Sequence, residues 1–193
     1  MHPSEHDERF ALIKRVLESA PARENIPIDD LTTDVHALAE AQYEPLVSLL
    51  IDGLDSPDWA WRSACLVNLG FHYPSSFIRP IFPKLRSMLL HDEGGDGDVR
   101  MTAARVLGRH ADALEASLVT ALTDDPDPYV RQSAFTALLR IAGVAPKRIL
   151  KIEVQLMRGE SVAISWDALQ QILREEGLPD LHESRSVSSS STG

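Results

Sequence analysis

The sequence predicts an all-α protein in which about five antiparallel helix pairs stack into a right-handed solenoid. Three segments of the chain align without gaps around an arginine, and each has the apolar spacing of an amphipathic helix. A second amphipathic segment precedes each of the three. No stretch alternates polar and apolar residues for long enough to predict a sheet.

The repeated segments are centred on Arg62, Arg100 and Arg131, which are 38 and 31 residues apart. In each segment an aspartate lies four residues before the arginine, a small residue lies three after it and a leucine lies seven after it. A weaker fourth copy is centred on Ser165 and lacks both the aspartate and the arginine. Such repetition is typical of solenoids, because each unit covers its apolar face only by stacking on its neighbours.

The repeated aspartates, Asp58, Asp96 and Asp127, are expected to cap helices, since an aspartate side chain accepts hydrogen bonds from the free amides of a first turn. After each aspartate an apolar stripe recurs at every fourth residue. The stripes are Trp61, Cys65 and Leu69; Val99, Ala103 and Leu107; and Val130, Ala134 and Leu138. Each reference arginine is expected to bridge to the repeated aspartate of an adjacent repeat and so to fix the geometry between repeats.

In chain order, residues 8–19 and 31–42 are predicted to form two helices of an atypical cap over residues 1–43. Residues 44–177 are predicted to form the repeats, and an apolar face marks the first helix of each pair. These faces are Leu46, Leu49, Leu50 and Leu54; Phe82, Leu85, Leu89 and Leu90; Leu114, Leu118, Val119 and Leu122; and Ile149, Ile152 and Leu156. Residues 178–193 end in a serine-rich run and are predicted to be a disordered tail.

These segments resemble the HEAT-repeat superfamily, especially its short bacterial form related to the phycobilin-lyase-type repeats. The features that carry the resemblance are the Asp, the Val-Arg pair, the small residues and the Leu-Gly end. The best copy runs from Val99-Arg100 to Leu107-Gly108, and the resemblance covers about residues 44–177. The resemblance implies stacked helix pairs whose second helices line a concave surface. It implies little about function, because repeat families share a scaffold and differ in their surfaces.

The composition favours a soluble protein and argues against a nucleic-acid binder. The 193 residues include 29 Asp and Glu against 19 Lys and Arg, which gives a formal net charge of -10, whereas general nucleic-acid binding needs a basic face. A single cysteine, Cys65, excludes an internal disulfide. The polar start and the absence of an apolar run of roughly 20 residues predict neither a secretory signal nor a membrane span. We therefore expect a cytoplasmic monomer.

No recognisable pattern of residues predicts catalysis, a cofactor or a metal. The stretch Gly94-Gly95-Asp96-Gly97-Asp98 lacks the Lys and the Ser or Thr of a phosphate loop. As a calcium loop starting at Asp92, the same region would place Ala103 where a glutamate is needed. His36 and Glu40 have helical spacing but lack a third ligand. The sequence therefore predicts a protein that is not an enzyme and has no cofactor.

The candidate binding surface is the face that the apolar stripe leaves open. It is predicted from the residues one, five and nine positions after each reference position. Those expected to contact a partner are Arg105, Arg109, Arg140, Arg174 and Trp166. In an acidic chain these arginines form a local positive strip that can receive an acidic segment of a partner. The alternative is that they are solvated residues favoured by the helix dipole near the last turn.

Three aromatic residues of the first repeat, Trp59, Phe71 and Tyr73, are a second candidate feature. They form either an exposed cluster of the kind that anchors interfaces or a buried group that packs inside the first repeat, where 38 residues separate the first two reference arginines. The sequence does not distinguish between these two.

The predicted function is a non-enzymatic scaffold or adaptor that binds another protein on its concave face. Two alternatives stay open. An immunity protein or antitoxin would neutralise a basic toxin through the acidic turns at residues 92–98 and 124–127. A subunit similar to the phycobilin lyases would act on a tetrapyrrole.

Overall fold

Helices joined by short turns make up the structure, and no strand occurs in the residues that it describes. The computed structural model describes residues 4–19 and 28–181, so the predicted tail lies outside the described residues from residue 182 onward. The helices, in chain order, are α1 (Glu5–Ser19), α2 (Ile28–Glu40), α3 (Pro45–Gly53), α4 (Trp59–His72), α5 (Ser75–Ile78), the 3-10 turn η2 (Arg79–Ile81), α6 (Phe82–His91), the 3-10 turn η3 (Gly95–Gly97), α7 (Asp98–His110), α8 (Ala116–Asp124), α9 (Pro128–Ile141), α10 (Pro146–Met157) and α11 (Trp166–Glu175).

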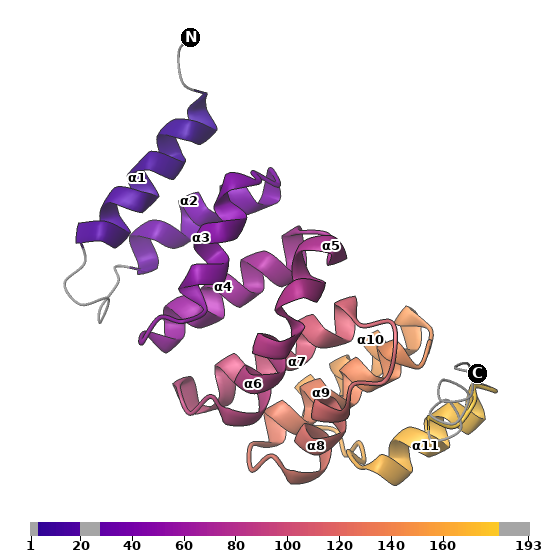
Figure 1. Cartoon of the computed structure of the whole chain (residues 1–193). Helices are drawn as coiled ribbons and strands as arrows, with labels where there is room; N and C mark the ends of the chain where they lie inside the picture. The colour runs from indigo at the N-terminus through magenta and orange to yellow at the C-terminus, as the bar shows by residue number, and fades with distance from the viewer. Residues whose placement is uncertain (1–3, 20–27, 182–193) are drawn as a thin grey trace, which may run out of the picture.

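The helices succeed one another as pairs along an elongated stack (Figure 1). The second helices of consecutive repeats pack side by side, α4 against α7 and α7 against α9. The first helices do the same, with α6 against α8. This arrangement confirms the predicted α-solenoid of helix pairs.

The small residues of the apolar stripes lie at equivalent buried positions, as predicted. Cys65, Ala103 and Ala134 each have 0 % of their surface exposed. Burial also raises the pKa of the Cys65 thiol, so this side chain remains protonated and packs as a small apolar group.

The Leu-Gly end of the repeat helices allows consecutive second helices to approach closely. A Cβ atom on Gly108 in α7 would overlap the Cβ of Ala137 in α9 and lie 2.6 Å from its Cα. A Cβ on Gly70 in α4 would overlap the side chain of Val106 in α7. Glycine at these positions therefore sets the spacing between repeats.

Two of the three predicted aspartate caps are confirmed. The Asp58 carboxylate accepts hydrogen bonds from the amides of Ala60 and Trp61 in α4, and Asp127 accepts one from Tyr129 in α9 at 2.7 Å. The cap predicted at Asp96 is wrong, because the 3-10 turn Gly95–Gly97 precedes α7. Helix α7 begins at Asp98, and Gly97, with a φ of 94°, takes the cap position without a side-chain hydrogen bond. The left-handed backbone at this position favours glycine.

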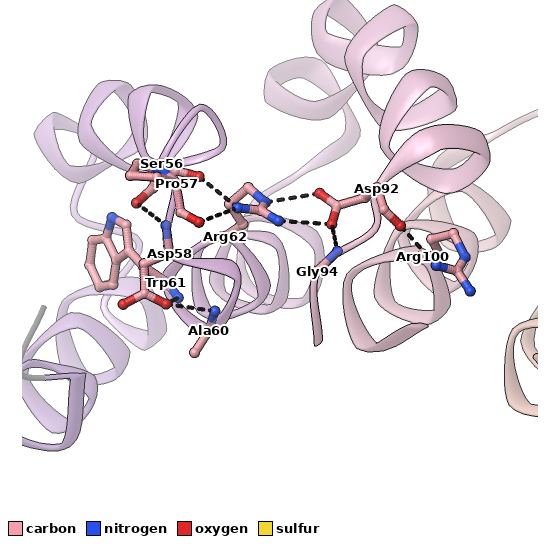
Figure 2. Close-up of polar contacts among 9 residues, drawn as sticks. All are labelled: Ser56, Pro57, Asp58, Ala60, Trp61, Arg62, Asp92, Gly94 and Arg100. Atoms are coloured by element: carbon pink, nitrogen blue, oxygen red, sulfur yellow. Dashed lines mark hydrogen bonds and ion pairs between the residues drawn. The ribbon is translucent and has the colours of Figure 1, made fainter. Parts of the chain in front are cut away.

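Arginine–aspartate pairs connect successive repeats, and Figure 2 shows the first of them. The Arg62 guanidinium donates to both carboxylate oxygens of Asp92, at 2.8 Å each, and also to the carbonyl oxygens of Ser56 and Pro57. Arg100 donates in the same way to Asp125, at 2.9 and 3.2 Å. Both pairs are largely buried, so they hold the two repeats in one fixed relation. We call these pairs the Arg–Asp ladder.

The ladder does not extend to the third reference arginine. Arg131 donates to the carbonyl oxygens of Asp125 and Pro126 in its own turn, at 2.6 and 3.0 Å. The bridge predicted for Arg131 is therefore wrong. The sequence accounts for this, because the turn between α10 and α11 contains no aspartate. For Arg62 and Arg100 the bridge between repeats is present, but the partners are Asp92 and Asp125 instead of the repeated aspartates.

Candidate functional site

A pocket of about 300 Å³ lies at the ends of the repeat helices and is lined by Phe71, Arg105, Arg109, Arg140 and Glu153. We call it the arginine pocket. Phe71, Arg109 and Arg140 each lie nine residues after a reference arginine, in α4, α7 and α9. Because these three helices pack in register, equivalent positions become neighbours in space.

The arginine pocket combines an exposed aromatic ring with guanidinium groups. The Arg109 guanidinium lies 5.5 Å from the centre of the Phe71 ring, a cation–π distance. Phe71 remains 40 % exposed. From α10, Glu153 accepts a hydrogen bond from Arg140, so this arginine already has a carboxylate partner.

Neither Arg105 nor Arg109 pairs with a carboxylate in residues 4–19 and 28–181, which is also true of Arg15, Arg131, Arg158 and Arg174. The arginines that do form ion pairs are Arg9, Arg62, Arg79, Arg86, Arg100, Arg140 and Arg148. In a chain with a net charge of -10, two uncompensated guanidinium groups on one helix form a local positive site.

A histidine pair lies close to the arginine pocket and was not predicted from the sequence. The rings of His36 in α2 and His72 in α4 meet edge to face, with their centres 4.8 Å apart. The pKa of His72 lies below its ordinary value, mainly because of burial and then because of the charges of His36 and Arg109. The histidines are 36 residues apart in the sequence, so no local spacing could indicate their contact.

The described residues do not bring metal ligands together. No group of three or more His, Cys, Asp and Glu side chains in the described part of the chain is arranged to hold a metal ion. His36 and Glu40 do approach each other, with 3.4 Å between Nε2 and Oε1.

Two residues predicted for the binding surface, Arg174 and Trp166, do not line the arginine pocket. Ser165 caps α11, and its hydroxyl accepts a hydrogen bond from the Ala168 amide at 3.1 Å. The fourth copy is therefore displaced by one helical turn from the register assumed in the sequence alignment. Arg174 is exposed on α11, and Trp166 is half-buried.

The aromatic residues of the first repeat do not form an exposed cluster. Tyr73 is buried, and its hydroxyl donates to the carbonyl oxygen of Tyr43 at 2.9 Å. Burial raises the pKa of Tyr73 to about 12. Trp59 and Phe71 are both partly exposed but lie at opposite ends of α4 (Trp59–His72). Tyr73 thus fits the alternative of a buried group, and the exposed cluster of three is wrong.

The acidic turns retain fewer free carboxylates than the sequence suggests. Asp92 and Asp125 belong to the Arg–Asp ladder, and Asp127 caps α9. Asp98 and Asp124 remain exposed at this edge.

Residues 82–152 match the profile of the family described as HEAT repeats. The matched segment runs from the start of α6 into α10 and includes Arg105, Arg109 and Arg140. The match confirms the relationship to HEAT repeats, whose members generally mediate protein–protein interactions and are typically not enzymes. A search of curated proteins finds no significant match to the chain. None of the helices in residues 4–19 and 28–181 has the length and apolar character needed to cross a bilayer.

Proposed function

We propose that this HEAT-like solenoid is a non-enzymatic interaction module, which binds a protein partner on its concave face through an acidic segment of that partner. The observation that carries the proposal is the presence of two guanidinium groups without carboxylate partners, Arg105 and Arg109, in a pocket of an acidic chain. A carboxylate of the partner would supply the charge-assisted hydrogen bonds that these groups lack in residues 4–19 and 28–181.

The pocket is also suited to an apolar contact beside the charged one. Phe71 offers a partly exposed ring, and the contact with Arg109 restricts the movement of both side chains. Groups already held in their binding positions lose less conformational entropy on association. An acidic segment with an apolar residue next to a carboxylate would therefore use both features. Arg105 and Arg109 lie one helical turn apart, so carboxylates about 5–6 Å apart would match them.

The test compares two charge reversals on the same scaffold. The double variant Arg105→Glu and Arg109→Glu changes the pocket, whereas Arg174→Glu changes an exposed arginine outside it. All three proteins, carrying the same affinity tag, are used to capture proteins from an extract of the native cell, and the captured proteins are quantified by mass spectrometry. The expected result is a protein retained by the parent and by Arg174→Glu but lost, at least tenfold, from the double variant.

Equal retention of every captured protein by the double variant and the parent would contradict the proposal. The melting temperature of the double variant should stay within about 2–4 °C of the parent, because exposed charges contribute little to stability. This comparison separates loss of binding from loss of folding.

The two alternatives make different predictions for the same proteins. Neutralisation of a basic toxin would depend on the exposed Asp98 and Asp124, so it would be lost in Asp98→Lys with Asp124→Lys and kept in the arginine double variant. A lyase-like subunit would give visible absorbance after mixing with a bilin and an acceptor protein.

A further inference from the structure

The carboxylate of Glu153 lines the arginine pocket but comes from another part of the fold. The pocket's aromatic and basic residues lie on α4, α7 and α9, whereas Glu153 lies in the middle of α10. No other carboxylate of the described residues lines this pocket. With Glu153, the pocket carries three guanidinium groups and one carboxylate, so its local charge is reduced but remains positive.

The contact between Arg140 and Glu153 is more accessible than the two pairs of the Arg–Asp ladder. The side chains of Arg140 and Glu153 are 35 % and 29 % exposed, against 15 % and 7 % for Arg100 and Asp125. A single oxygen of Glu153 accepts from Arg140, whereas Asp125 accepts with both oxygens. Partly exposed pairs of this kind contribute little to stability and can be exchanged for other partners.

We infer that Glu153 occupies, in the free protein, the position that a carboxylate of the partner takes on Arg140 in the complex. Glu153 is thus an internal competitor, which weakens binding of an acidic segment and sets its affinity. This inference rests on the proposed function, since it assumes that the arginine pocket is the binding site. It adds that a carboxylate of this chain, carried by α10, competes with the partner's carboxylate for Arg140.

The test uses a fluorescein-labelled hexaglutamate peptide as the probe and hexaglutamine as its neutral control, with binding measured by fluorescence anisotropy. An ionic strength of about 0.1 M limits the influence of distant acidic side chains, because the Debye length is then about 10 Å. Glu153→Gln removes the competing charge and nearly preserves the shape of the side chain. Glu160→Gln is the matched control, because it makes the same change in net charge at an exposed residue outside the arginine pocket.

Glu153→Gln should bind the probe about three- to fivefold more tightly than the parent, as expected for loss of one partly exposed ion pair. Glu160→Gln should change the affinity less than twofold. Glu153→Asp keeps the charge but shortens the side chain, and its affinity should lie between those of the parent and Glu153→Gln. Binding by Glu153→Gln that is no tighter than binding by Glu160→Gln would overturn the inference.

Failure of the inference can be distinguished from failure of the proposed function. If the variant with both Arg105→Glu and Arg109→Glu loses probe binding while Glu153→Gln shows no gain, the pocket binds acidic segments and the role of Glu153 is refuted. If the arginine double variant binds the probe as well as the parent does, the proposed function is refuted and the inference with it.

Discussion

Replacing Gly108 with alanine separates the effect of helix propensity from that of packing between repeats. Gly108 lies near the end of α7, where its Cα faces Ala137 of α9. Intrinsic propensity alone predicts that Gly108→Ala stabilises the helix by about 1 kcal/mol. The structure predicts the opposite sign, because the added methyl group has no room.

The magnitude follows from the atoms that the new Cβ would meet. It would lie 2.6 Å from the Cα of Ala137 and overlap its Cβ. No change of side-chain rotamer can relieve a contact with the backbone, so α7 and α9 must move apart. Such overpacking costs about 1–3 kcal/mol. After the propensity gain of about 1 kcal/mol is subtracted, we expect the free energy of unfolding to fall by up to about 2 kcal/mol.

Thermal and urea unfolding followed by circular dichroism would measure this change. The melting temperature is expected to fall by up to about 8 °C for a chain of this size. The control is Ala137→Gly, alone and combined with Gly108→Ala, because removing the Ala137 Cβ makes room for part of the new methyl group. The double variant should be more stable than the sum of the two single effects predicts. A Gly108→Ala protein more stable than the parent would refute the close approach of α7 and α9.

Two further predictions concern the ladder and a buried histidine. Asp125→Ala leaves the largely buried Arg100 without its carboxylate and should lower the free energy of unfolding, measured in urea, by about 3 kcal/mol. The control, Glu5→Ala, removes an exposed pair with Arg9 and should lower it by less than about 0.5 kcal/mol. Equal effects of the two substitutions would show that the ladder does not stabilise the stack. His110 is buried against the Gly70 carbonyl, and burial lowers the pKa of its side chain. As the pH falls, the imidazole therefore takes up a proton at a higher pH in the unfolded chain than in the folded one. For this reason the free energy of unfolding should decrease as the pH falls below about 6.5. His110→Gln should reduce the slope of stability against pH in that range, and an unchanged slope would show that His110 does not contribute to it.

The repeat and its register can be predicted from the order of residues alone. The Asp, Arg, small-residue and Leu positions predicted where α4, α7 and α9 lie and which of their residues are buried, because helix periodicity and capping depend on neighbours along the chain. Once the register was set, it also predicted that Arg109 and Arg140 lie at equivalent positions. The match to HEAT repeats over residues 82–152 covers the region where this pattern is strongest.

The predictions failed where local spacing does not decide the structure. The sequence pattern aligns Ser165 with the reference arginines, one turn too early, because Ser165 caps α11. The pattern predicts a cap at Asp96, but the 3-10 turn Gly95–Gly97 precedes α7 and Gly97 takes the cap position. Tyr73 is a possible surface anchor in the sequence, whereas in the structure it is buried and its hydroxyl donates to the carbonyl oxygen of Tyr43. In each case the start of a helix or the burial of a side chain depends on the conformation of the preceding turn or on a backbone group far away in the sequence.

The composition of the arginine pocket depends on how the helices pack. Phe71, Arg109 and Arg140 repeat at one position of the sequence pattern, but Glu153 belongs to the first helix of the next pair and shares no register with them. The same holds for the contact between His36 and His72. A charge that comes from a different helix cannot be read from periodicity, because its distance to the site depends on how the helices pack and not on their separation along the chain. For this reason the sequence could predict a positive strip, while the structure showed which arginine is already neutralised and which two are not.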